Sequence, residues 1–137
     1  MQNTSPPPPP SLLPHILAAA QLLADACDPI RFARCARTRH TQVQRCLARI
    51  ARPLRSLAAR LHRGLVSGPL SDQAAYTTFA LSCLRRFESD LLNLFRSLNN
   101  RARRTPALAA LVEQTMEAVS LVEERDRALM ANALCCA

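Results

Sequence analysis

The chain is poor in the residues that build sheets, tight turns and membrane spans. It has no lysine and no tryptophan, only two glycines, one tyrosine and four phenylalanines among 137 residues. Alanine, leucine and arginine dominate instead, and these residues lose little side-chain freedom in a helix. No apolar run reaches the roughly 18 residues that a transmembrane helix needs. The composition therefore predicts an all-α fold without a membrane-spanning helix.

Acidic residues are absent from one long stretch of the chain. All 18 basic residues are arginine, and the net charge is +8. Residues 72–137 balance eight arginines with eight acids, so the excess charge comes from residues 29–71, which hold no acid. Like charges four residues apart destabilise a helix by a few tenths of a kcal/mol each. A partner that neutralises them would be stabilising. The arginines of this stretch are Arg31, Arg34, Arg37, Arg39, Arg45, Arg49, Arg52, Arg55, Arg60 and Arg63.

Apolar residues recur at helical spacing along most of the chain. The pattern, together with proline, serine and glycine breakpoints, predicts helices at about 11–27, 29–66, 72–99 and 106–134. Ser11 and Ser71 are the expected N-caps of the first and third helices. Residues 1–10 contain five consecutive prolines and are expected to form a disordered arm. Residues 11–137 would then form a single domain, an up-and-down bundle of three to four amphipathic helices. An elongated coiled coil with a partner chain is the main alternative.

The segment from Val43 to Leu65 has the most regular pattern. Its apolar residues step by three and four, which keeps them on one narrow side of a helix, with arginines on the other. Pro53 lies inside this pattern and should either kink the helix or start a new one. The apolar phase continues through it, which favours a kink. The apolar positions are Val43, Leu47, Ile50, Leu54, Leu57, Leu61 and Leu65.

The aromatic residues concentrate in the third predicted helix. Four of the five aromatics of the chain lie on one broad apolar face there. Large rings bury much apolar surface, so this face is the expected centre of the core. Its members are Tyr76, Phe79, Ala80, Cys83, Leu84, Phe87, Leu91, Leu94, Phe95 and Leu98.

No residue pattern predicts a metal site, a cofactor or catalysis. Cys27, Cys35, His40 and Cys46 are ligand types, but they lack the close pair typical of zinc sites. Neither a glycine-rich phosphate loop nor a nucleophile elbow is present. Glutamates on arginine-bearing helices are expected to form surface ion pairs, such as Glu123 with Arg127. We therefore expect a non-enzymatic protein.

The cysteine pattern indicates the cellular compartment in which the protein is expected. Four of the six lie in helical patterns, where cysteine behaves as a small hydrophobe. Reduced thiols and an intracellular protein, cytoplasmic or nuclear, are expected rather than a secreted disulfide framework. Cys135 and Cys136 near the C-terminus could be acylated, although unmodified exposed thiols are commoner.

The arginines on the polar side of the second predicted helix are the strongest functional lead. We expect them to bind an acidic protein surface or partner helix, in a homo- or hetero-oligomer. Sequence-nonspecific binding of nucleic acid through residues 31–63 is an alternative, and an anionic membrane surface is a weaker one. A solvated face without a partner is the plain alternative to all three. The expected binding residues are Arg45, Arg49, Arg52, Arg55, Arg60 and Arg63.

Overall fold

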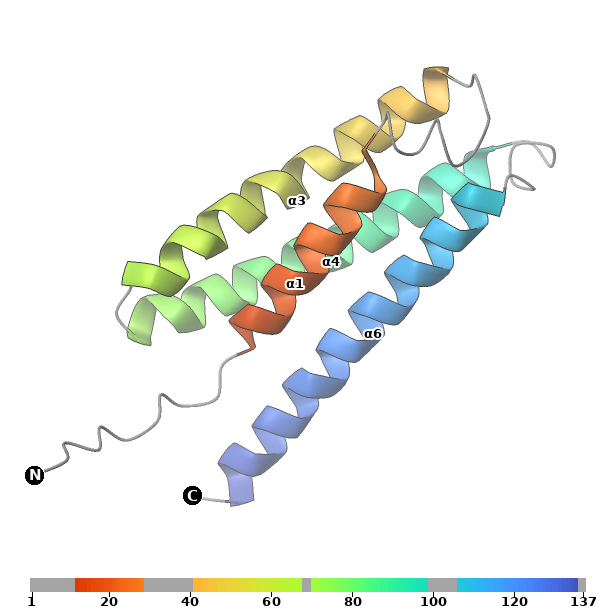
Figure 1. The fold of residues 1–137 in the computed structure, drawn as a ribbon. Coiled ribbons are helices and arrows are strands. Elements are labelled where there is room, and N and C mark those ends of the chain that lie inside the picture. Colours follow the sequence, from red (N-terminus) through yellow and green to blue (C-terminus); the bar gives the residue numbers. More distant parts are fainter. Residues whose placement is uncertain (1–11, 29–40, 68–69, 99–105, 136–137) are drawn as a thin grey trace, which may run out of the picture.

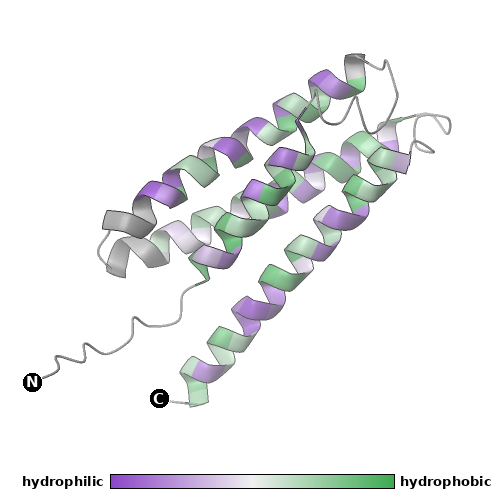
Figure 2. Cartoon of the chain, in the orientation of Figure 1, coloured by the Kyte–Doolittle hydropathy of each residue, from purple (hydrophilic) through white to green (hydrophobic). Residues whose placement is uncertain are grey.

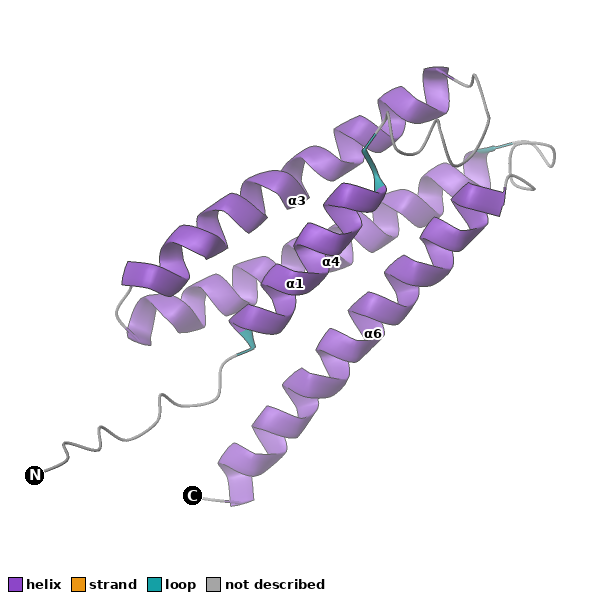
Figure 3. Cartoon of the chain, viewed as in Figure 1, coloured by secondary structure: helices purple, strands orange, loops and turns teal. Residues whose placement is uncertain are grey.

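The computed structural model describes residues 12–28, 41–67, 70–98 and 106–135. These residues form four helices and no strand (Figure 3), which confirms the all-α prediction. The predicted arm at residues 1–10 and the first part of the predicted helix 29–66 lie outside the described residues. The helices are α1 (Leu13–Ala26), α3 (Thr41–Ser67), α4 (Leu70–Ser97) and α6 (Pro106–Cys135).

The four helices lie side by side, and consecutive helices run in opposite directions (Figure 1). Helix α3 packs on α1 and α4, and α6 also packs on α1 and α4, so α3 and α6 lie diagonally across the bundle. Helices α1 and α4 each contact all three of the other helices. The composition of α1 suits this place, because small alanines allow neighbouring helices to approach while Ile16 and Leu23 fill the core.

Two of the expected helix starts differ from the structure. Leu12, which has no side-chain capping hydrogen bond, precedes α1, so the prediction of Ser11 as its N-cap is wrong. Helix α4 already includes Leu70, so Ser71 belongs to its first turn and does not precede it. Helix α6 begins at Pro106 as predicted, because the fixed φ of proline suits a first helical position.

Helix α3 continues through Pro53 without a break. Proline lacks the N–H that would bond the Arg49 carbonyl, but it lies on the exposed side of the helix, where water can satisfy that carbonyl. The apolar stripe therefore keeps its phase, and Leu47, Leu54, Leu57 and Leu61 are all at most 2% exposed. Figure 2 shows the resulting alternation of hydrophilic and hydrophobic segments along α3.

The aromatic face predicted to form the centre of the core is buried only in part. Phe87 is buried, but Tyr76 is 39% and Phe79 is 47% exposed. Helix α1 has only 14 residues against 28 in α4. The first turns of α4 therefore extend beyond α1 (Figure 1), with α3 beside them. The expectation that the aromatic face is the centre of the core is wrong for these two rings, whereas Ala80, Leu84, Phe87 and Leu91 of the same face are buried in the core.

Candidate basic interaction surface

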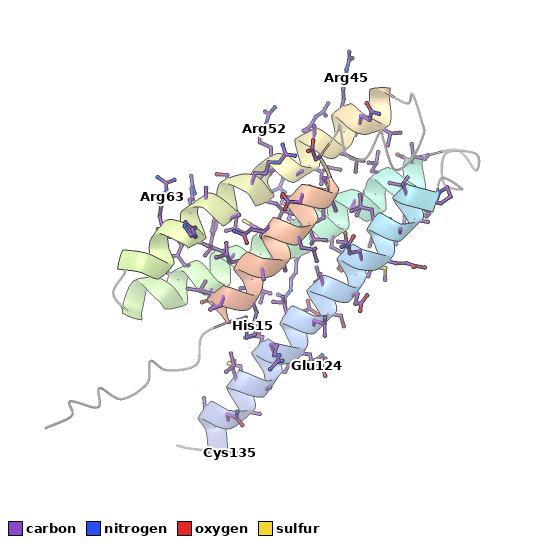
Figure 4. The ribbon with its side chains drawn as sticks, in the orientation of Figure 1. His15, Arg45, Arg52, Arg63, Glu124 and Cys135 are labelled. Atoms are coloured by element: carbon purple, nitrogen blue, oxygen red, sulfur yellow. The ribbon has the colours of Figure 1, made fainter. Side chains whose placement is uncertain are left out.

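The six arginines predicted to bind a partner are all exposed on α3. At about 100° per residue, five of them fall within an arc of about 80°, opposite the buried leucines. In Figure 4, Arg45, Arg52 and Arg63 all point away from the bundle on the same side. The structure thus brings most of the predicted residues together over the length of α3. We call the set Arg45, Arg49, Arg52, Arg60 and Arg63 the arginine stripe.

Most arginines of the stripe have no carboxylate partner in the part of the chain that the structure describes. Among the described residues, no ion pair involves Arg45, Arg49, Arg52 or Arg60. Arg63 donates a hydrogen bond from Nε to the carbonyl oxygen of Ala59 at 3.4 Å. Because α3 holds arginines and no acid, the stripe is a row of like charges on one side of the helix.

Arg55 does not belong to the stripe. It lies about 60° beyond the edge of the arc and faces α1, where its charge affects Cys27. Burial of the Cys27 thiol raises its pKa from the ordinary 9.0 to about 12, and the positive charge of Arg55 opposes this shift. Cys27 is 0% exposed, and its backbone N–H donates to the carbonyls of Leu23 and Ala24 at the end of α1. The charge of Arg55 therefore acts on the C-terminal end of α1, and Arg55 is left out of the arginine stripe.

The thiols should differ sharply in reactivity. Cys27 is buried and protonated, whereas Cys135 is exposed. At about pH 8 a maleimide reagent should label Cys135 within minutes and Cys27 only after unfolding in urea. Mass spectrometry after timed labelling measures both rates. Equal native rates for the two thiols would contradict this burial.

The raised pKa of Cys27 also sets a pH dependence. Its contribution to stability is fully present below about pH 9. Between pH 9 and about 12 the thiol ionises in the unfolded chain and stays protonated in the folded one, so stability falls as pH rises. Urea titrations across this range, with Cys27→Ala for comparison, should show a shallower alkaline loss in the variant. Parallel curves for the two proteins would show that Cys27 does not drive the loss.

A cleft next to the stripe was not predicted from the sequence. It has a volume of about 630 Å³ between α3 and α4, and its lining includes Arg60, Ala75, Tyr76 and Phe79. The two rings follow the apolar period of α4, so sequence alone places them in the core. The only available signal was the length of α1, which is too short to cover both ends of α4. The cleft combines apolar surface with a guanidinium group at one end of the stripe.

The acids form ion pairs, but not all the expected ones. Arg85 Nε lies 3.0 Å from Glu123 Oε1, which joins α4 to α6, and Arg86 pairs with Asp90 at 4.0 Å. The expected pairing of Glu123 with Arg127 is not formed. Burial raises the pKa of Glu88, and the negative charge of Glu123 adds to the shift. Exposed pairs of this kind contribute about 0–1 kcal/mol each.

Within the described part of the chain, no group of three or more His, Cys, Asp or Glu side chains is placed to hold a metal ion. Cys35 and His40, two of the four ligand types considered above, lie outside that part. The helices in it include none with the length and apolar character to cross a membrane. No protein-family model, curated protein or solved structure matches the chain.

Proposed function

We propose that the protein is a non-enzymatic interaction protein that docks an acidic partner through the arginine stripe of α3. One observation carries the proposal: the stripe is exposed along one side of helix α3, and the opposite side of this helix is buried in the core. The helix therefore presents its cations in a fixed row. Arginine suits this task, because its planar guanidinium binds carboxylates through two parallel hydrogen bonds.

A regular helix with acids at helical spacing fits this row best. The stripe runs from Arg45 to Arg63, a rise of about 27 Å. An acidic helix of similar length would place carboxylates along one side at the same period. Binding would also relieve the repulsion between neighbouring arginines, so part of the affinity comes from α3 itself.

The test is the affinity for a fluorescent helical peptide that carries glutamates at i, i+4, i+7 and i+11. Replacing Arg45, Arg49 and Arg52 together with glutamine should weaken binding by about 3- to 150-fold, since each exposed pair contributes about 0.2–1 kcal/mol. Fluorescence anisotropy measures the change.

The matched control replaces Arg86, Arg125 and Arg127, which lie on α4 and α6, with glutamine. It removes the same net charge from exposed positions elsewhere. An equal loss of affinity in the control would show that net charge, rather than the stripe, attracts the peptide. Both variants should unfold at the temperature of the wild type, because all six side chains are exposed.

Nucleic acid is the second candidate, favoured by the exposed rings beside Arg60. Stacking of bases on aromatic side chains next to arginine is typical of single-strand binding. If each of the five arginines of the stripe neutralises one phosphate of a single strand, log affinity should fall against log salt with a slope of about −3.5. A steep slope with a single-stranded probe, together with weak peptide binding, would favour nucleic acid over a protein partner.

An anionic bilayer fits less well. It would need the apolar side of α3, yet Leu47, Leu54 and Leu61 are buried in the bundle. A helix cannot present the same side to lipid and to a core, so insertion would require the bundle to open.

A further inference from the structure

Helix α6 carries a row of acids on its outer side. Glu113, Glu117 and Glu124 are all exposed and fall within an arc of about 40°, opposite the buried Leu111, Thr115 and Val122. In the part of the chain that the structure describes, no ion pair involves these three glutamates. We call them the acidic row.

The acidic row and the arginine stripe lie on opposite sides of the molecule. Helices α3 and α6 are diagonal in the bundle, and Figure 4 shows Glu124 on α6, across the molecule from Arg45 and Arg52. One molecule therefore cannot pair its own two surfaces.

The spacing of the two rows matches. From Glu113, the other two acids lie four and eleven residues on, with rises of about 6 and 16.5 Å. From Arg49, the arginines Arg52 and Arg60 lie three and eleven residues on, with rises of about 4.5 and 16.5 Å. Two helices that run parallel would align these charges to within one residue.

We propose that the acidic partner of the arginine stripe is the acidic row of a second copy of this chain. The inference rests on the proposed function, because it names the partner of the same surface. The contact joins two different surfaces, so each copy in a chain keeps one free stripe and one free acidic row. Assembly is head-to-tail and can grow beyond a dimer. Although the net charge of +8 opposes it at long range, physiological salt screens charges beyond about 8 Å and leaves facing pairs effective.

The test uses two neutralised variants of the full chain in sedimentation velocity. The first replaces Arg49, Arg52 and Arg60 with glutamine, and the second replaces Glu113, Glu117 and Glu124 with glutamine. The wild type should form species larger than a dimer at about 0.05 M salt and dissociate at about 0.5 M. Each variant alone should be monomeric at the concentration where the wild type associates.

An equimolar mixture of the two variants decides the geometry. The first variant keeps its acidic row and the second keeps its stripe, so the mixture should form a 1:1 heterodimer that does not grow. A mixture that remains monomeric, or variants that still self-associate, would overturn the head-to-tail contact. Matching far-UV circular dichroism and melting temperatures show that both variants are folded.

If the wild type is monomeric at every salt concentration but still binds the acidic peptide, self-association is wrong and the proposed function stands. If it binds neither, both are wrong.

Discussion

Ala20→Asp is expected to abolish cooperative folding. Ala20 is 0% exposed in α1, one of the two helices that contact all three others. A carboxylate there would be buried without a partner, and an uncompensated buried charge costs about 3–5 kcal/mol. The added volume in a close-packed core costs a further 1–3 kcal/mol or so. The sum is comparable to the whole stability of a typical domain, about 5–15 kcal/mol.

Thermal unfolding followed by circular dichroism measures this effect. The wild type should melt in one cooperative transition, and the variant should show none. Ala18→Asp is the matched control, because Ala18 is on the same helix but exposed. It should change stability by no more than about 0.5 kcal/mol. If the two variants melt alike, α1 does not hold the central position that the structure gives it.

Leu54→Ala should have the second largest effect. Leu54 is 0% exposed on α3, next to Pro53, where the helix already lacks one backbone hydrogen bond. Truncating a buried leucine typically costs about 2–5 kcal/mol, and the upper part applies where the site cannot collapse. Close packing on both sides of α3 by α1 and α4 limits such collapse.

Urea titration gives this difference in the free energy of unfolding. Arg55→Ala is the control one position along, at an exposed residue, and it should cost about 0.5 kcal/mol or less. A Leu54→Ala loss no greater than that of the control would mean that the apolar side of α3 does not face the core. The outward orientation of the arginine stripe, which is opposite that apolar side, would then also be wrong.

The sequence predicts α3 well because this helix carries leucines on one side and arginines on the other, both at the helical period. The leucines at 47, 54 and 61 step by seven, so their burial fixes the orientation of the helix. The arginines between them must then face outward. A local pattern is enough here, because both surfaces belong to the same element.

Features that depend on two or more helices could not be predicted in this way. Tyr76 and Phe79 have the spacing of core residues, and their exposure depends on how far α1 extends along α4. Glu123 has an arginine four residues on, but Arg85 of α4 reaches it instead. Relative helix positions along the bundle axis decide both, and no periodicity within one helix contains that information.

The acidic row could not be predicted for the same reason. Within α6 its three glutamates have the spacing of an ordinary solvated helix surface. Only the diagonal placement of α6 and α3 shows that the two charged rows face away from each other. Because the two rows face away from each other, the acidic row of one copy can face the arginine stripe of another.

Residue-resolved modification of the arginines by phenylglyoxal tests the central claim most directly. Arg45, Arg49, Arg52 and Arg60 should react readily in the free protein at low concentration, and faster than Arg85, which pairs with Glu123 at 3.0 Å. Adding the acidic helical peptide should protect these four residues and leave Arg125 and Arg127 unchanged. Stripe arginines that are already protected in the free monomer, or that the peptide does not protect, would contradict an open cationic docking surface on α3.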